Sequence, residues 1–330
     1  GDSMGRLKYV PIETLRAGDR VVSYAGAGRL ILRGATVSAV GSQPFSGRLV
    51  VVHADDGKTS RYTPGHRCIA RLAPALAGKH VVYLMRRGAS FRVGSTRGMV
   101  RSETGLAGRA RIQRADAVWI LSVHDTRSEA LAAEAYTSWR FGIPDMQFAV
   151  GTGPARHRDQ AAMDAFWLKV GYLSTAADQC LRAFDREMAF PFSVSGEWTL
   201  LSRPSEIRAC NLLDGAEILD GDAMVNNGKR GKEGRKTFRR ITLATEFYEG
   251  PVWSLDVEGY HTYVADGLVT HNSLELVTAQ ARDAVATFLD VDYVRGKIAE
   301  LTADASAPLG DAAKAVEVVG KRLMFGEDVT

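Results

Sequence analysis

The sharpest chemical signal in the chain is His271-Asn272-Ser273, at the end of a β-rich stretch. The side-chain amide nitrogen of an Asn can attack the carbonyl carbon of its own residue, which breaks the chain after that residue. The attack is slow without a donor on the carbonyl oxygen and a group that handles the amide proton. His271 and His261 are suitable groups. A bare His-Asn-Ser is more often a strand-end Asn beside surface histidines.

A second candidate lies at a tight turn, Thr63-Pro64-Gly65-His66. A His that follows a strand at a turn can protonate a leaving amide nitrogen, and the hydroxyl of a Thr three residues before it can hold an oxyanion. Alone, the motif is more often a simple turn with a solvent-facing imidazole, because Pro-Gly already explains the bend.

The elements that would position these residues are short β-strands. Residues 1–77 alternate β-branched runs with turn signals, which predicts strands near 20–26, 34–41, 47–58 and 60–70. The same texture returns from Thr237 and ends at Asn272. Its return predicts that one β-domain is interrupted by an insertion.

Between the β-rich parts, residues 78–150 predict two strands around a hairpin, a helix, a buried strand and a second helix that stops at a Gly. Residues 151–195 open with a linker and continue as a helical stretch. The predicted organisation is therefore a β-domain in two parts, an α/β insertion with a helical extension, and a helical tail. Their boundaries are 1–77, 78–195, 196–272 and 273–330.

The β-rich parts together resemble a Hint domain, specifically an intein. Residues 10–26 are similar to its N-terminal splicing block, 61–70 to its Thr-x-x-His block, and 250–273 to its two C-terminal blocks. The resemblance implies a horseshoe-shaped, mainly β fold that acts once on itself and needs no cofactor to excise itself and join its flanks. Residues 273–330 would then belong to the host protein, and the partners of the intein would be its own flanking segments.

The resemblance also implies a role for each site residue. Thr63 and His66 would activate the upstream scissile bond, His261 and His271 would assist cyclisation of Asn272, and Ser273 would be the downstream nucleophile.

The sequence departs from the intein pattern in two places. Inteins of this kind begin with Cys or Ser shortly before the Gly-Asp at Gly1-Asp2, so the chain as written is expected to cleave after Asn272 without splicing. Ser254 stands where many relatives carry Asp. Cys68 and Cys210 have no spacing that would make either a substitute nucleophile, and we expect both to be buried free thiols.

The insertion resembles the core of a GIY-YIG nuclease. Val81-Val82-Tyr83, a hairpin and Phe91-Arg92-Val93-Gly94 carry the resemblance, with Arg92 at the position of the second motif's Tyr. The resemblance implies a homing endonuclease that cuts double-stranded DNA. A base or polarised water would act near Tyr83, Arg109 would face the developing charge, and Glu134 would hold Mg²⁺.

The charge of the insertion fits a DNA partner. Residues 78–150 hold 11 basic and 6 acidic residues, whereas the whole chain has a net charge of only +4. Arg101 and Arg111 compete with Arg109 for the cationic role. The alternative is that Tyr83 is plain core, the arginines form a solvated face, and Glu134 ends a row of helical ion pairs.

Composition limits the remaining classes of function. With 330 residues, 45% hydrophobic and 24% charged, the chain is an ordinary globular protein rather than a disordered, collagenous or coiled-coil one. It shows no membrane span or signal peptide, so we expect a cytoplasmic protein with no membrane partner. Three hypotheses stay open: a self-processing intein, a DNA endonuclease carried on an inactive Hint domain, and a binding module in which both activities have decayed.

Overall fold

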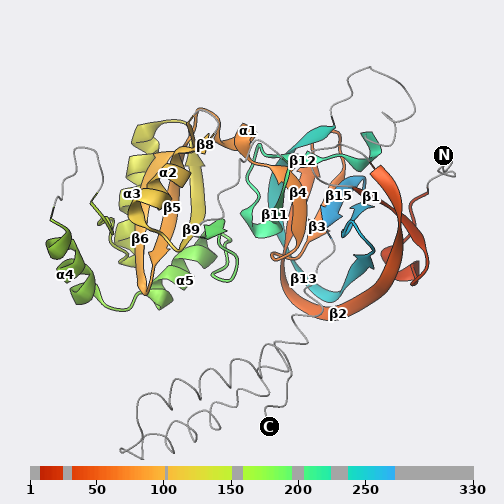
Figure 1. The fold of residues 1–330 in the computed structure, drawn as a ribbon, viewed down its shortest axis with the longest axis horizontal. Helices are drawn as coiled ribbons and strands as arrows, with labels where there is room; N and C mark the ends of the chain where they lie inside the picture. The colour runs from red at the N-terminus through yellow and green to blue at the C-terminus, as the bar shows by residue number, and fades with distance from the viewer. Residues whose placement is uncertain are drawn as a thin grey trace, which may run out of the picture. The chain divides into compact units, whose positions relative to one another are not determined.

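The computed structural model describes residues 8–24, 32–100, 103–150, 159–194, 204–223 and 237–271. Within those ranges the protein is mainly β, as predicted, with one nine-stranded and one four-stranded antiparallel sheet (Figure 1). Strands of the large sheet come from 20–71 and 205–271, whereas those of the small sheet come from 80–124 and 193–194. The predicted tail at 273–330 lies outside the described residues.

The large sheet runs in the order β1-β2-β13-β12-β4-β15-β14, with β3 paired to β2 and β11 paired to β4. Short helices η1 (Ile12–Thr14), α1 (Ala73–Leu76) and η2 (Ala209–Asn211) accompany it. Its strands are β1 (Arg20–Tyr24), β2 (Leu32–Ala54), β3 (Thr59–Tyr62), β4 (Arg67–Arg71), β11 (Ser205–Arg208), β12 (Glu217–Leu219), β13 (Phe238–Val257), β14 (Thr262–Ala265) and β15 (Leu268–His271).

Two long strands, β2 and β13, pair along almost their whole length and form the curved arch in Figure 1. The predicted strands at 34–41 and 47–58 are therefore wrong as separate elements, because β2 runs unbroken from Leu32 to Ala54. The turn expected at residues 55–57 follows it. Pro44 lies opposite Pro251 in the register. Two prolines can face each other in an antiparallel pair when neither position needs an N–H donor, so the strand continues where sequence alone suggests a break.

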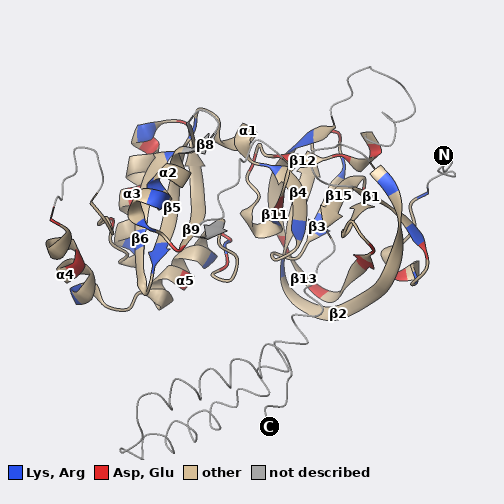
Figure 2. Cartoon of the chain, viewed as in Figure 1, with Lys and Arg blue, Asp and Glu red and all other residues tan. Residues whose placement is uncertain are grey.

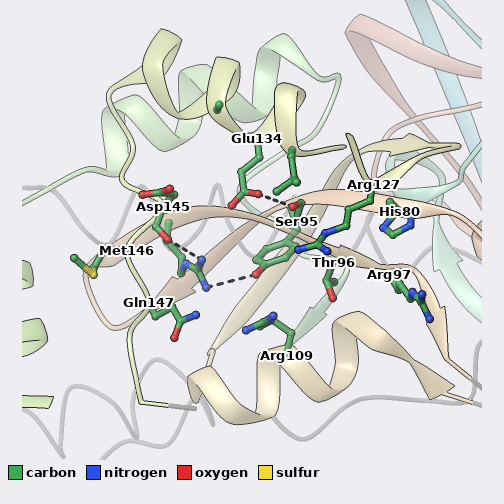
Figure 3. A pocket seen from close by; sticks show the side chains of 14 residues that line it. His80, Ser95, Thr96, Arg97, Arg109, Arg127, Glu134, Asp145, Met146 and Gln147 are labelled. Atoms are coloured by element: carbon green, nitrogen blue, oxygen red, sulfur yellow. Dashed lines mark hydrogen bonds between the residues drawn. The ribbon is translucent and has the colours of Figure 1, made fainter. Parts of the chain in front are cut away.

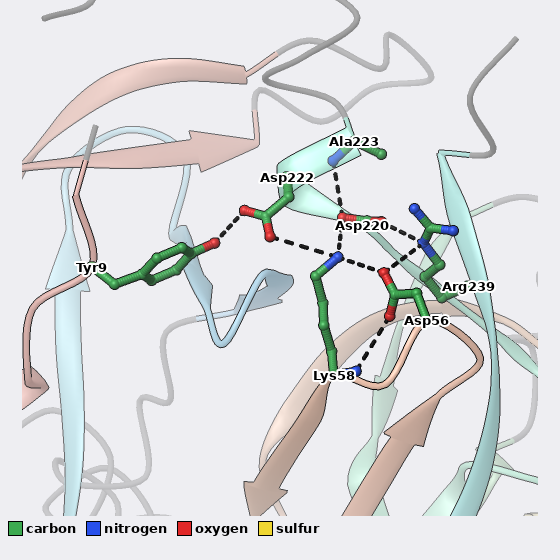
Figure 4. A network of polar contacts seen from close by, with 7 residues as sticks. All are labelled: Tyr9, Asp56, Lys58, Asp220, Asp222, Ala223 and Arg239. Atoms are coloured by element: carbon green, nitrogen blue, oxygen red, sulfur yellow. Dashed lines mark hydrogen bonds and ion pairs between the residues drawn. The ribbon is translucent and has the colours of Figure 1, made fainter. Parts of the chain in front are cut away.

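A buried ion network fastens the turn between β2 and β3 to β12 and β13 (Figure 4). The carboxylate of Asp220 is fully buried and accepts from Lys58 Nζ at 3.1 Å and from Arg239. Lys58 and Arg239 also contact Asp56, at 2.7 and 3.1 Å. Because a buried carboxylate is costly unless it is paired, these contacts hold residues from both β-rich parts of the chain together.

Strand β4 lies between β11 and β15 and brings these two distant segments together. In its register Cys68 lies opposite Ile207 of β11 and opposite Thr270 of β15. Residues 205–208 and 268–271, which are far apart in sequence, therefore flank the same strand. The turn that carries His66 directly precedes β4.

The small sheet has the order β10-β9-β5-β6 and carries helices on its faces. Val82, Leu84 and Trp119 pack with residues of α3 and α5, and the alternate residues Val81 and Tyr83 belong to a core shared with α2. Its elements are β5 (His80–Arg87), β6 (Ser90–Arg97), α2 (Gly105–Gln113), β9 (Ala117–His124), α3 (Arg127–Phe141), α4 (Gln160–Val170), α5 (Ser174–Ala183) and β10 (Ser193–Val194), with a short pair β7 (Met99–Val100) and β8 (Glu103–Thr104).

The predicted order of hairpin, helix, buried strand and helix over 78–150 is confirmed. Helix α3 begins with a capping box between Thr126 and Glu129 and ends at Gly142, whose φ is +65°. The helical stretch predicted beyond residue 160 is two helices, because Gly171 ends α4 with a φ of +73°. None of the described helices is long and apolar enough to cross a membrane.

Candidate functional site

The first candidate site lies where the turn before β4 meets the end of β15. The Nε2 atom of His66 is hydrogen-bonded to the hydroxyl of Thr270, and that hydroxyl donates to the carbonyl oxygen of Arg67 at 3.2 Å. Since the hydroxyl has one proton to give, Nε2 of His66 must be the donor in the first bond. Nδ1 of the neutral ring is then the nitrogen that can accept a proton.

Burial decides the protonation state of His66. The side chain is 8% exposed and its ring stacks on Tyr62 with a centroid separation of 4.9 Å. Burial, with smaller contributions from His271 and two arginines, lowers the pKa of His66 to about 3. At neutral pH His66 is therefore uncharged, and any proton that it delivers comes from a neutral imidazole, a far weaker acid than the imidazolium.

The turn that carries His66 is held from two sides. Its own N–H donates to the carbonyl oxygen of Thr63 at 3.0 Å, which closes the turn, and Thr63 is half-buried at its start. The N–H of Ala209 donates to His66 O at 2.7 Å and that of Cys210 to Pro64 O at 3.0 Å. The segment after β11 thereby fixes the position of the histidine.

His271 is the last residue of β15 and is 8% exposed. Its Nε2 atom lies 3.2 Å from Oε1 of Glu206, and the other carboxylate oxygen of Glu206 accepts from Arg67 Nη1 at 2.7 Å. The hydrogen bond from His271, with help from Arg67, lowers the pKa of Glu206 to about 2 although partial burial opposes the shift. Sequence reasoning missed Glu206, because no motif includes it and its strand is far in sequence from both His66 and His271.

His261 lies beside His271, with ring centroids 6.3 Å apart. It has a positive φ of +52°, in the turn before β14, and its side chain is exposed. Its Nδ1 atom is 4.0 Å from Oδ1 of Asp256. The pairing of β14 with β15, in which Thr262 lies opposite His271, sets this spacing.

The structure thus brings together three of the predicted residues, His66, His261 and His271. Asn272 and Ser273 come directly after His271 and lie outside the described residues. Ser254 is buried in β13.

The two cysteines near this site are buried free thiols, as expected. Burial raises the pKa of Cys210 to about 12 and raises that of Cys68 as well. Neither thiol is therefore prepared to act as a nucleophile, because the reactive form is the thiolate.

A second candidate site is a cavity of about 710 Å³ in the small-sheet region (Figure 3). The four residues predicted from the nuclease resemblance, Tyr83, Arg92, Arg109 and Glu134, all line it. Four arginines and two carboxylates face this space. The lining residues are His80, Tyr83, Arg92, Ser95, Thr96, Arg97, Arg109, Arg127, Leu131, Glu134, Ala135, Asp145, Met146 and Gln147.

Arg92 is the most buried of the four arginines, at 4% exposure. Its Nη2 atom donates to the carbonyl oxygen of Asp145 at 2.8 Å, and Nη1 makes a long 3.5 Å contact with the hydroxyl of Tyr83. Its Nε–H has no hydrogen-bond partner within the described residues. A buried donor without a partner is costly, and this nitrogen has almost no accessible surface, so an acceptor could reach it only if neighbouring side chains moved.

Glu134 and Arg109 approach the cavity from helices α3 and α2 and lie on opposite sides of it in Figure 3. The hydroxyl of Ser95 donates to Glu134 Oε2, which orients the carboxylate. Arg109 is half-buried against the cavity, whereas Arg111 is exposed and does not line it. Arg101 lies outside the described residues.

Glu134 offers a single oriented carboxylate, which is one of the ligands that Mg²⁺ uses in proteins. The described residues contain no group of three or more His, Cys, Asp or Glu that could hold a metal ion. Mg²⁺, however, is commonly bound through one or two carboxylates together with water and substrate phosphates, so a single oriented carboxylate beside cationic groups is compatible with it.

Gly94 leaves room for Tyr83 in this cavity. A Cβ atom at position 94 would overlap the hydroxyl of Tyr83. The glycine that the nuclease resemblance places after Arg92-Val93 therefore has a local steric reason in this structure.

Comparisons with known proteins give little further information. No protein-family model matches the chain, and no curated protein matches it. Among solved structures, the G-1F mutant of the Ssp DnaB mini-intein variant M86 matches with a TM-score of 0.29 and 12% identity, over 80% of this chain and 89% of that one. A TM-score this low does not establish a common fold.

Proposed function

We propose that the protein is an intein-type self-processing domain that breaks its own chain after Asn272. One observation carries the proposal: His66, His261 and His271 converge at the end of β15, so the residue before Asn272 already stands inside a histidine cluster. Three histidines from three separate turns and strands are not needed to hold a sheet together. Proton transfer at a fixed position is the work that this arrangement suits.

The proposed reaction forms one bond and breaks one. The side-chain nitrogen of Asn272 bonds to its own backbone carbonyl carbon, and the bond from that carbon to the nitrogen of Ser273 breaks. One proton moves from the attacking amide to the leaving amine. The products are a chain ending in a cyclic imide and a fragment with a free amine at Ser273, and no cofactor takes part.

Thr63 and His66 would act at the upstream junction in the complete splicing reaction. Burial keeps His66 neutral and its one N–H is given to Thr270, so we assign its Nδ1 the role of accepting a hydrogen bond from the scissile amide rather than proton donation. The hydroxyl of Thr63 would support the oxyanion. Ligation would further require an upstream thiol or hydroxyl, with Ser273 as the acceptor from the host segment.

Intact-mass measurement of the purified chain during incubation at neutral pH tests the proposal. We expect release of residues 273–330 and a partner fragment one water lighter than its hydrolysed form, because it ends in the imide. Asn272→Ala must abolish release. A wild-type chain that stays whole, or a partner fragment that has the hydrolysed mass from its first appearance, would contradict cyclisation.

A second candidate function is phosphodiester cleavage of double-stranded DNA in the cavity. The observation that favours it is the convergence of Tyr83, Arg92, Arg109 and Glu134 on one space in the part of the chain with the excess of basic residues (Figure 2). Arg92 would add positive charge beside a phosphoryl group, and Arg109 would face the charge that develops. Mg²⁺, held through Glu134, would supply charge neutralisation.

Incubation with supercoiled plasmid DNA, with Mg²⁺ or with a chelator, tests this second function. We expect cutting that depends on Mg²⁺ and is lost in Glu134→Ala. Binding measured separately should weaken steeply from low to physiological salt, because cationic side chains release counterions when they contact phosphates. Salt-independent binding, or cutting that survives Glu134→Ala, would remove the assignment. A decayed binding module would show neither chain cleavage nor cutting.

A further inference from the structure

A carboxylate that no sequence motif indicates holds one nitrogen of the His271 ring. Glu206 on β11 contacts Nε2 of His271 at 3.2 Å, and its second oxygen accepts from Arg67 Nη1 at 2.7 Å. The side chain of His271 is 11% exposed and that of Glu206 is 46% exposed, so the histidine is the buried member of the pair. The contact therefore fixes the ring.

The two contacts of Glu206 also keep it ionised. Arg67 lies on β4, next to β11, and its guanidinium group orients the carboxylate while His271 holds the other oxygen. The pKa of Glu206 is lowered to about 2, chiefly by the hydrogen bond from His271. An ionised carboxylate only accepts hydrogen bonds, so Nε2 of His271 must carry a proton.

We propose that Glu206 is a positioning residue for His271, which keeps the proton on Nε2 so that Nδ1 is the nitrogen that takes the amide proton of Asn272. This inference rests on the proposed self-processing. When Nδ1 takes that proton, the ring becomes an imidazolium, and the negative charge of Glu206 stabilises it. The same proton then passes from Nδ1 to the nitrogen of Ser273 as the peptide bond breaks, which returns the ring to its neutral form.

Other charged or titratable groups face His271, and none of them replaces Glu206. The ring of His261 stacks beside it, and the neutral ring of His66 lies across the site. Neither can supply the negative charge. The groups around His271 are Glu206 from β11, Arg67 from β4, His66 from the turn before β4, and His261 from the turn before β14. Asp256 of β13 lies against His261, 4.0 Å from its Nδ1 atom.

Glu206→Gln tests the inference, because Gln keeps the shape and one acceptor oxygen but removes the charge. We expect cleavage after Asn272 to slow by about tenfold or more, and the midpoint of its pH–rate profile to move to lower pH. Glu217→Gln is the matched control. Glu217 of β12 pairs at 2.6 Å with Arg71 of β4, the strand that also carries Arg67, but it does not contact His271 in the described structure. The Glu217→Gln chain should cleave at the wild-type rate. A Glu206→Gln chain with the wild-type rate and midpoint would overturn the positioning role while leaving self-processing intact.

Nitrogen NMR of the His271 ring separates the two claims if the wild-type chain does not cleave. In the full Asn272→Ala chain we expect the neutral ring to carry its proton on Nε2, and Glu206→Gln to introduce the Nδ1–H form. A ring with its proton on Nδ1 in the parent chain would overturn the inference whether or not cleavage occurs. Loss of self-processing with the expected ring signals would instead contradict only the proposed function.

Discussion

The histidine cluster and the arginine-lined cavity handle charge in opposite ways. In the cluster, His66 is buried and neutral, and one carboxylate, Glu206, holds His271. In the cavity, four arginines and two carboxylates face about 710 Å³ of space, and Arg92 keeps one donor without a partner in the described part of the chain. A site that acts on its own backbone needs strand pairing that positions the reacting residues and side chains that carry protons, but it needs no cavity for a ligand. A site for an external anion needs space and fixed positive charge.

The proposed separation of the two sites would be contradicted most clearly if a substitution in the histidine cluster changed DNA binding or DNA cutting. His271→Ala should slow cleavage after Asn272 by about 10²- to 10⁴-fold, because it removes the proton carrier next to the reacting amide. DNA binding should not change. Time courses by intact mass and salt titrations of DNA binding measure the two effects. His53→Ala, an exposed histidine of β2, is the control and should leave both unchanged. Equal cleavage rates for His271→Ala and wild type would contradict the role of the cluster.

The reverse change should affect only the cavity. Arg109→Ala should lower DNA cutting by about 10²-fold or more and weaken binding only slightly, because the lost cation faces the charge that develops in the reaction. Arg111 lies two residues further along the same helix and does not line the cavity. Arg111→Ala therefore controls for the loss of one positive charge. Gel assays of plasmid cutting and binding measure both. If Arg111→Ala impaired cutting as much as Arg109→Ala, the cavity would not be the cutting site.

A steric test sharpens the comparison within the cavity. Gly94→Ala should lower the free energy of unfolding by about 1–3 kcal/mol, because the new methyl group meets the Tyr83 hydroxyl inside packed structure. Gly108→Ala is the control, since a Cβ there meets nothing within 4 Å and alanine favours the helix. Urea unfolding measures both. A Gly94→Ala chain as stable as wild type would show that Tyr83 has room to move.

The sequence predicted what local patterns encode. Alternating β-branched runs indicate the sheet, and Gly142 marks the end of α3 correctly. It failed where distant residues decide. The runs at 34–41 and 47–58 were expected to be separate strands, whereas pairing with β13, with Pro44 opposite Pro251, makes them parts of one strand.

The same limit applies to the candidate sites. His66 and His271 stand in motifs, so their residue types and spacing are enough to mark them as candidates. Glu206 reaches His271 only because β11 and β15 both flank β4, a pairing that no spacing in the sequence reports. The choice of Arg109 over Arg111 likewise depends on which face of α2 turns toward the cavity.

The smallest expected effect is a pH dependence of the free energy of unfolding that the buried neutral His66 causes. The arginines of the cavity stay charged over the same pH range and cause none. The pKa of His66 is lowered to about 3 in the folded chain, whereas the unfolded value is 6.5. Below pH 6.5 the unfolded chain therefore binds a proton that the folded chain refuses, so stability falls as the pH falls from 6.5 toward 3. Between about pH 6.5 and 5.5 this loss should be about 1 kcal/mol.

Urea unfolding across this range, in Asn272→Ala and in the same chain with His66→Gln, isolates that slope. Glutamine does not titrate, so its variant should lose less stability as the pH falls, whatever constant offset the lost stacking on Tyr62 adds. The other histidines and the carboxylates are common to both chains and cancel in the difference. Parallel pH profiles would mean that His66 accepts a proton equally well in the folded and unfolded chain. Its ring would then be able to reach the imidazolium form at the junction, and the assignment of a neutral hydrogen-bond acceptor would be wrong.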